Sequence, residues 1–437
     1  MQLEDAGRAR GARQRLRAAA CVLLAATTPS GVGAATAPHW QLDGSALFYG
    51  EQSRARVAEP VARITRMFAD GQSLSARFAL DAMTGASPTG ALPTGTVQTT
   101  TSASGSTTTS SATAIPTQPF QDLRGALDLD WLRPIGTLVT TTTGFHFSHE
   151  KDYQSLGGNA RLSVDLMHRL ATVTVGGGYN HDGVFPVGGI PQGLADSTVA
   201  RRVGTETKNV ATGLLGVSRV LTRRWMIGVT ASRSKEDGYL TEPYKVVSVL
   251  DPSTQRPMLQ LTENRPATRT RSDVLASSVS HLERDVLYLS YRYYWDDWGV
   301  RSNTLDMKLR HELSGGTWIQ PHLRAYEQTS AQFFVFGLIH GPPLPQYASA
   351  DDRLGPLRTA TLGATYGFQL PGHSGEFTVR GEYLYQWASG RPHIPVSQVG
   401  SRVEREDDGG EGGATGSSNS ASGTSIGSVL AGYTVQF

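Results

Sequence analysis

The sequence predicts an all-β fold: a transmembrane antiparallel β-barrel of about sixteen strands, with long extracellular loops and short periplasmic turns. Three observations predict it. Apolar and polar side chains alternate over segments of about ten residues, the length of a tilted membrane-spanning strand. Turn residues separate these segments by short and long connections. The chain also ends on such an alternating segment. Counts of fourteen or eighteen strands remain open, because strand boundaries are hard to place from sequence.

The first residues predict export. Basic residues come first, then a short apolar core over 18–26, then small residues near 35–37. This pattern is typical of a secretory signal peptide, which we place at 1–37, with cleavage after Ala37 or, as second choice, after Ala34. The single cysteine, Cys21, lies within it, so we expect no thiol chemistry and no disulfide in the mature chain.

Composition limits the remaining choices. The formal net charge of +2 gives no indication of a nucleic-acid partner. The hydrophobic content is only 38%, and no later segment approaches the roughly 18 apolar residues of a membrane helix. A soluble periplasmic β-protein and an outer-membrane barrel both fit, because polar lumen residues lower the hydropathy of a barrel.

Alternation favours the barrel, which would occupy 38–437. The clearest segments lie at 74–81, 127–131, 162–166, 287–296, 362–370 and 376–387. Several of the apolar faces end in an aromatic residue, as at Trp131, Trp295 and Trp387. Aromatic residues at strand ends fit the girdles that mark both membrane interfaces.

The final segment predicts barrel closure. Its apolar face carries the C-terminal barrel signal Val429, Tyr433, Val435 and Phe437, and Leu430 is the one exception to the alternation. We expect this strand to meet the first strand. Trp40 opens that strand directly after the signal peptide, so no N-terminal plug is expected. The expected partners are the barrel assembly machinery, the lipid bilayer and lipopolysaccharide; the oligomeric state stays open.

The connections give the strand count. Short turns are expected near 69–71, 133–136, 168–169, 222–223, 283–284, 314–316 and 371–375. Long outer loops are expected near 84–121, 183–206, 238–268, 332–352 and 390–420, with brief outer turns near Gln52, Asp152 and Asp297. The Ser/Thr tract at 94–114 and the acidic, Gly-rich tract at 404–423 cannot bury a core. They are tolerated surface insertions or, alternatively, glycan-bearing or adhesive loops.

Several stretches carry a family resemblance. They are YGEQSRARVAEP at 49–60, DAMTGASPTGA at 81–91, HEKDYQSLG at 149–157, GYLTEPYKVVSV at 238–249, ENRPATRTR at 263–271 and YRYYWDDWGVRSNTLDMKLRHEL at 291–313. With them the chain resembles the domain-of-unknown-function family 3570 over essentially the whole mature sequence. That resemblance implies an outer-membrane protein of a Gram-negative bacterium and supplies no activity or catalytic residue.

Charged residues on the polar faces are the candidate functional residues. The predicted lumen-lining set is Arg77, Asp81, Asp128, Asp130, Arg161, Asp165, Arg292, Asp306, Lys308, Arg310, Arg324, Arg380 and Glu382. Opposed charges across a pore select small polar solutes. The leading hypothesis is therefore a porin-like passive channel or binder, narrowed by a loop around 242–250 that could instead be a simple hairpin. A closed network of salt bridges would indicate a non-conducting barrel that anchors a partner assembly.

Other motifs have weaker interpretations. Arg265, Arg269 and Arg271 could line an anion-attracting mouth, bind lipopolysaccharide phosphates, or pair with Glu263 and Asp273. Simple pairing is the interpretation we favour. The pair Asp296 and Asp297 could hold Ca²⁺ or form an ordinary turn.

We expect no enzyme, metal or cofactor. A hydrolase would need pairs such as Asp296 with Asp297 and His181 with Asp182, or a set such as Ser148, His149 and Asn180. No spacing ties these residues together. His146 and Glu150 share a strand face but lack a third metal ligand.

Overall fold

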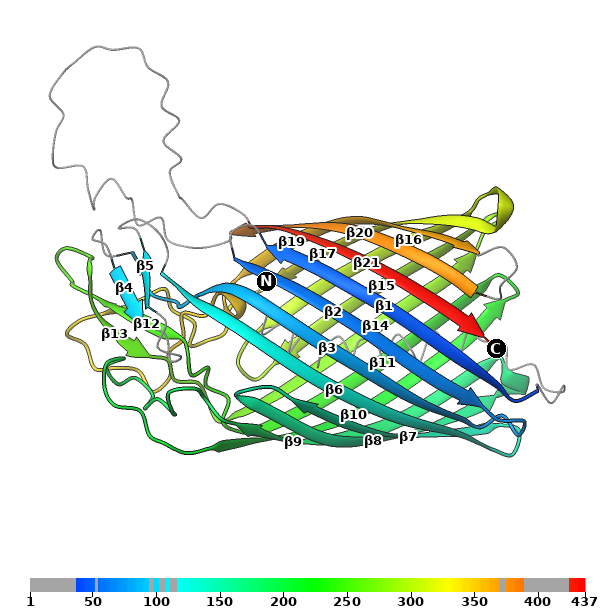
Figure 1. Ribbon diagram of the computed structural model, residues 1–437, viewed down its shortest axis with the longest axis horizontal. Coiled ribbons are helices and arrows are strands. Elements are labelled where there is room, and N and C mark those ends of the chain that lie inside the picture. Colours follow the sequence, from blue (N-terminus) through cyan, green and yellow to red (C-terminus); the bar gives the residue numbers. More distant parts are fainter. Residues whose placement is uncertain are drawn as a thin grey trace, which may run out of the picture.

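The computed structural model describes residues 37–51, 54–93, 98–101, 107–110, 116–369, 375–388 and 424–436. Sixteen strands close into one antiparallel barrel (Figure 1), which confirms the predicted fold class and strand number. In order around the barrel they are β1 (His39–Glu51), β2 (Ala55–Met67), β3 (Ser73–Pro88), β6 (Thr117–Ile135), β7 (Val139–His149), β8 (Tyr153–Leu166), β9 (Ala171–Val184), β10 (Glu206–Thr222), β11 (Trp225–Gly238), β14 (Thr268–His281), β15 (Asp285–Asp296), β16 (Arg301–Glu312), β17 (Thr317–Gln328), β19 (Leu357–Gln369), β20 (Gly375–Ala388) and β21 (Thr424–Gln436). The predicted signal peptide lies outside the described residues, apart from Ala37.

The outer surface of the barrel is apolar because the period of two places every second side chain on it. Phe48, Phe78, Leu129 and Leu362 are exposed large hydrophobic residues on this surface. The residues between them along each strand face inward, and many of them are polar. An apolar exterior of this kind is stable only against hydrocarbon, so the barrel spans a membrane.

Exposed tryptophans lie near both ends of the strands. Trp40, Trp131 and Trp225 lie toward the end with the short turns, whereas Trp295 and Trp387 lie toward the opposite end. Their rings fit the two interfacial girdles of a membrane barrel. No helix in the described ranges is long and apolar enough to cross a membrane.

The C-terminal strand closes the barrel against the first strand. In the β1–β21 register Leu42 lies opposite Val435, Gly44 opposite Tyr433, and Phe48 opposite Val429. Val429 is exposed on the apolar exterior, as the alternation predicts. Phe437 lies outside the described residues.

The turns at one end are short. Two of them contain 3₁₀ turns, η1 (Met167–Arg169) and η2 (Ser314–Gly316). Gly315 and Gly316 both have positive φ, near +74° and +73°, which glycine adopts without a steric cost. One expected boundary was wrong: β6 continues through Pro134 to Ile135, so the turn covers 136–138. The strand-end position explains this, because proline is tolerated there.

The connections at the other end are mostly long, and three of them pack together as one lid, defined here as residues 185–205, 239–267 and 329–356. The lid contains the three-stranded sheet β13-β12-β18, formed by β12 (Val246–Leu250), β13 (Pro257–Thr262) and β18 (Leu338–Ile339), and the 3₁₀ turn η3 (Asp352–Leu354). Figure 1 shows β12 and β13 beyond the end of the barrel that lies opposite the C-terminus. The connection after β3 carries the small hairpin of β4 (Gln98–Thr101) and β5 (Thr107–Ser110). The loop expected near 390–420 lies outside the described residues.

Candidate functional site

The inward faces of β2, β3, β6 and β7 carry one group of charges, the Asp128 cluster, which comprises Glu59, Arg77, Asp128 and His146. The Arg77 guanidinium lies 2.8 Å from the Asp128 carboxylate and 3.7 Å from that of Glu59. His146 Nδ1 lies 2.5 Å from the other Asp128 oxygen. Asp130 faces the same space, because an added Cβ at Gly144 would come within 2.7 Å of its Oδ1. Positive and negative groups are therefore paired on this wall.

Three further candidates lie on neighbouring strands. Asp81 is almost fully buried, and its carboxylate lies 3.8 Å from Arg124. Asp165 accepts a hydrogen bond from the Thr172 hydroxyl at 2.7 Å. Arg161 is half-buried on the inward face of β8.

A second group of charges, the His322 cluster, lies on β16, β17 and β20 and comprises Asp306, Lys308, His322, Arg324, Arg380 and Glu382. His322 Nε2 lies 2.8 Å from Asp306, and Nδ1 lies 2.9 Å from Glu382. Arg324 donates to Asp306 at 2.7 Å. Lys308 lies 3.8 Å from Asp306, and Arg380 lies 3.9 Å from Glu382. Five of the six residues were sequence candidates, and the fold brings them together.

The last two candidates lie apart from both clusters. Arg292 pairs with Asp273 at 2.6 Å. Arg310 lies near the turn end, where it pairs with Glu312 at 2.7 Å and stacks over the Trp318 ring at 4.1 Å.

Sequence reasoning missed the residues that join the candidates. Three residues that contact the carboxylates or guanidinium groups of the candidates are absent from the predicted lumen-lining set: Glu59, His146 and His322. Their position on the polar face of an alternating strand was an available signal. The strand of His322 alternates weakly, because Pro321 and Ala325 take the place of bulky residues on its outer face.

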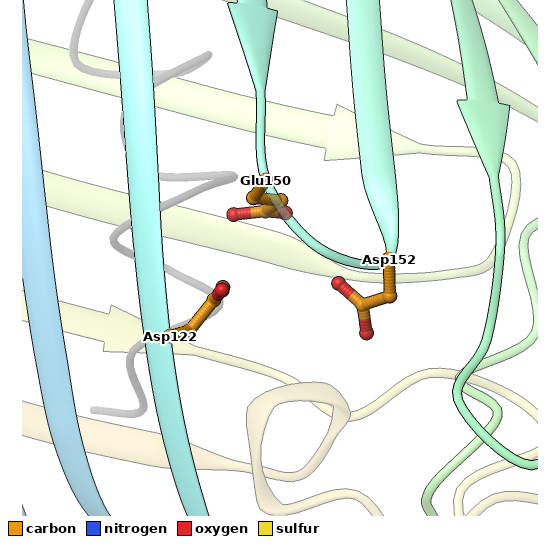
Figure 2. A group of neighbouring side chains, drawn as sticks. All are labelled: Asp122, Glu150 and Asp152. Atoms are coloured by element: carbon orange, nitrogen blue, oxygen red, sulfur yellow. The ribbon is translucent and has the colours of Figure 1, made fainter.

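Three carboxylates converge at the outer turn between β7 and β8 (Figure 2). Oxygen atoms of Asp122, Glu150 and Asp152 all lie within 4.8 Å of one another. Burial and the neighbouring Asp122 raise the pKa of the Glu150 carboxyl to about 9. Glu150 is therefore protonated at neutral pH and can share its proton with Asp122. Three carboxylates in this arrangement could bind a divalent cation. The proton shared by Glu150 and Asp122, however, already reduces the repulsion between the carboxylates.

The lid is held by a buried ionic cluster. Arg265 lies 2.7 Å from Asp351 and donates to Glu263 at 3.0 Å, and all three side chains are almost fully buried. Arg353 also pairs with Asp351 and lies 3.6 Å from Glu242. Burial alone would raise the pKa of Asp351, but the cations around it, Arg353 first, hold that pKa well below its usual range.

Two lid residues tie the lid to the barrel rim. The Tyr244 hydroxyl donates to Asp152 at 2.8 Å. The Lys245 ammonium donates to the carbonyl of Pro88, the last residue of β3, and to Ser87. The segment that was expected to narrow the barrel or form a hairpin is therefore part of a packed structure.

The three arginines of 263–271 are all paired. Arg265 pairs with Glu263, as expected, but Arg269 pairs with Asp296 and Arg271 with Glu236. Asp273 instead pairs with Arg292 on the adjacent strand.

Asp296 and Asp297 form an ordinary turn. Asp296 Oδ1 accepts from the Val300 backbone N–H, and Asp297 accepts from that of Thr270. The Arg269 guanidinium packs 4.2 Å from the Trp298 ring centre beneath this turn. Both carboxylates are thus engaged by the protein itself.

The described residues do not assemble either hydrolase set. His181 faces outward and contacts Asn209, whereas Asp182 faces inward and contacts Lys208. Ser148 is buried inside the barrel, while its neighbour His149 is on the outer face. His146 contacts Asp128, so it does not join Glu150 as a metal ligand.

Comparisons with solved structures find other barrels at low similarity. CdiB from Acinetobacter baumannii is 7% identical, with a TM-score of 0.44 over 91% of this chain, and this chain spans 60% of its length. OccK2 (OpdF) from Pseudomonas aeruginosa is 8% identical, with a TM-score of 0.38 over 92% of this chain and 98% of its own. A mutant of the TodX monoaromatic hydrocarbon channel is 8% identical, with a TM-score of 0.37 over 92% of this chain and 90% of its own. At these identities and TM-scores, the functions of these proteins cannot be assigned to this chain.

Sequence comparison finds a family. A family model described as "Protein of unknown function (DUF3570)" matches residues 13–395. No curated protein matches the sequence.

Proposed function

The chain belongs to the DUF3570 family of proteins of unknown function, and from this premise we propose that it is an outer-membrane barrel through which small polar solutes pass passively beneath a folded lid. The observation that carries the proposal is the exposure of polar side chains that face inward. Arg63, Asn159 and Arg324 all lie on the inward faces of their strands, yet each remains exposed. An interior filled by salt bridges would bury them.

The strand number supports a lumen that holds water. Small barrels of about eight strands fill their interior with side chains, whereas barrels of about sixteen strands leave room for water. The Asp128 cluster and the His322 cluster would then face this water across the barrel. Their charges would replace part of the hydration of a polar solute as it passes.

The lid would set the access path from outside. It is built from three connections whose contacts join residues far apart in the sequence, such as Glu263 with Ser349, and Leu92 of the connection after β3 donates to Ser248 of the lid. Solutes would pass between the lid and the strand ends, or enter when the lid moves.

A conductance measurement tests the proposal. The mature chain, refolded and inserted into planar bilayers, should give discrete current steps in KCl, and proteoliposomes that contain it should swell in small sugars or amino acids. Absence of current and of swelling, from a barrel shown by circular dichroism to be folded, would exclude passive transport.

The lid favours one alternative. Val247, Ser248, Ala348 and Ser349 are completely buried within it, which is more packing than a flexible gate needs. A closed lid would suit a non-conducting barrel that anchors an envelope assembly. Stable co-purification of one partner with a barrel that carries no current would support this second function.

The membrane environment of the proposal follows from the exterior of the barrel. Lipid would cover the apolar belt, lipopolysaccharide would contact the outer rim, and the barrel assembly machinery would act on the C-terminal strand. The two hydrolase sets suggested by the sequence are not assembled in the described ranges, so neither of them supports a catalytic role.

A further inference from the structure

We propose that the His322 cluster is a binding site for solutes that carry a carboxylate or phosphate group, and that it gives the barrel a preference for anions. The inference deepens the proposed function, on which it rests, by naming a class of solute. It is carried by the charge balance of the cluster, the depth of each side chain and the position of the cluster in the barrel.

The cluster carries more positive than negative charge. Both ring nitrogens of His322 contact carboxylate oxygens, one of Asp306 and one of Glu382. A carboxylate can only accept a hydrogen bond, so both ring nitrogens must carry hydrogen and the ring is a cation. With Lys308, Arg324 and Arg380, the cluster therefore has four cationic groups around two carboxylates.

The two arginines are more exposed to the lumen than the carboxylates they contact. The side chain of Arg324 is 45% exposed and that of Asp306 14%. The side chain of Arg380 is 38% exposed and that of Glu382 22%. The carboxylates thus lie against the wall, and a solute in the water meets the guanidinium groups first.

The guanidinium group of Arg380 retains donors for a ligand. Among the described residues, Arg380 donates only through Nε, to the Thr365 hydroxyl at 3.2 Å. Its two terminal nitrogens are therefore available. A guanidinium matches the two oxygens of a carboxylate or phosphate with parallel hydrogen bonds, which a halide or a neutral sugar cannot accept in the same way.

The opposite wall does not cancel this charge. In the ring of sixteen strands, β16 and β17 lie eight positions from β6 and β7, so the walls that carry the His322 cluster and the Asp128 cluster lie opposite each other. On that wall Arg77 and Asp128 are both recessed, with side chains 12% and 16% exposed. Their charges pair with each other, so this pair presents little exposed charge opposite the two arginines.

Two measurements test the inference on the refolded full barrel. In a planar bilayer with a KCl gradient, the sign of the reversal potential should show that chloride passes more readily than potassium. The double variant Arg324→Gln/Arg380→Gln should lose this preference. Arg233→Gln, which removes an outward-facing arginine of β11, is the matched control and should keep it.

Binding of succinate, followed by calorimetry in detergent, is the second measurement. Wild type and Arg233→Gln should bind it, and the double variant should bind at least about tenfold more weakly, the loss expected for about 1.4 kcal/mol. Current without anion preference, or succinate binding unchanged in the double variant, would overturn the inference while the channel stands. Absence of current with succinate binding that depends on Arg324 and Arg380 would overturn the channel and keep the binding site.

Discussion

Glu150 shows how a single residue reports its surroundings. It lies at the outer turn between β7 and β8, half-buried and facing Asp122 and Asp152. Arg124 is the nearby cation, and the Tyr244 hydroxyl binds Asp152. Burial of the Glu150 carboxyl, together with the negative charges of Asp122 and Asp152 beside it, raises its pKa to about 9.

This pKa predicts how stability depends on pH. Between the unfolded value of 4.5 and the folded value of about 9, the folded barrel keeps a proton that the unfolded chain has lost. The free energy of unfolding contributed by Glu150 therefore falls as pH rises through this window. Glu150→Gln cannot titrate, so it should be more stable than wild type near pH 8, by about 1 kcal/mol or more.

Urea unfolding in lipid vesicles at several pH values would measure this difference. The control is Glu327→Gln, which changes an exposed glutamate on the outer face of β17. The difference in free energy of unfolding between this variant and wild type should not grow as the pH rises. If the Glu150→Gln advantage did not increase with pH, the carboxyl would not be protonated in the folded barrel.

At the scale of elements, the lid depends on its buried ions. Arg265 is surrounded by Glu263 and Asp351 without access to water. Replacing it by methionine would leave two buried carboxylates without this cation, a change that costs about 3–5 kcal/mol in comparable sites. That energy would be lost from the lid and not from the barrel wall.

Arg265→Met should therefore loosen the lid while the barrel still folds. We expect faster proteolysis within 239–267 and, if the barrel conducts, a larger or less interrupted current. Arg256→Met, at the exposed β12–β13 turn, is the control. A lid that resisted protease as well as wild type would show that its apolar packing suffices without Arg265.

Strand ends also depend on particular glycines. Gly238, the last residue of β11, has φ near +118°, and a Cβ there would lie 2.2 Å from the carbonyl oxygen of Thr207. Gly238→Ala should destabilise the barrel by about 1–3 kcal/mol, through backbone strain and the displaced strand. Gly213→Ala is the control, because a Cβ at that position has no atom within 4 Å.

The same urea unfolding would measure both glycine variants. Equal stability of Gly238→Ala and wild type would mean that β10 and β11 can separate at this end without cost. The lid connection after β11 would then begin from a flexible position.

At the scale of the whole molecule, closure depends on the pairing of β1 with β21. Ala46 and Ala431 are direct partners in this register. Each lies two residues from an outward-facing residue of its strand, Phe48 or Val429, so both face outward. The only natural cysteine is Cys21, in the predicted signal peptide, so engineered cysteines would have no competitor in the mature chain.

The double variant Ala46→Cys/Ala431→Cys should therefore form an intramolecular disulfide on mild oxidation, because directly opposed residues lie close enough for one. Gel mobility before and after reduction would detect it. Ala46→Cys/Val435→Cys is the control, since Val435 pairs with Leu42. Equal cross-linking of the two variants would contradict the register.

Local pattern determined the wall of this protein. The alternation of Leu289, Tyr291 and Tyr293 with polar neighbours is a property of adjacent residues, and it requires a strand with one apolar face wherever the chain goes. Sixteen such strands, joined by turns and ending on an alternating segment, require closure, because an open edge cannot be satisfied in lipid. The charged residues facing inward were predictable for the same reason.

Tertiary structure alone decided which of those charges meet. Asp273 was expected beside the arginines of 263–271 but pairs with Arg292, and His322 joins Asp306 to Glu382 across four neighbouring strands, β16, β17, β19 and β20. The alternation of side chains along a strand shows which face of the sheet each side chain lies on. It does not show the height of that side chain along the barrel axis or which residue lies beside it on the next strand. Those depend on strand register and on the order of strands around the ring, which arise only when the whole sheet closes. The lid follows the same principle, because its buried ions come from connections that are distant in the sequence.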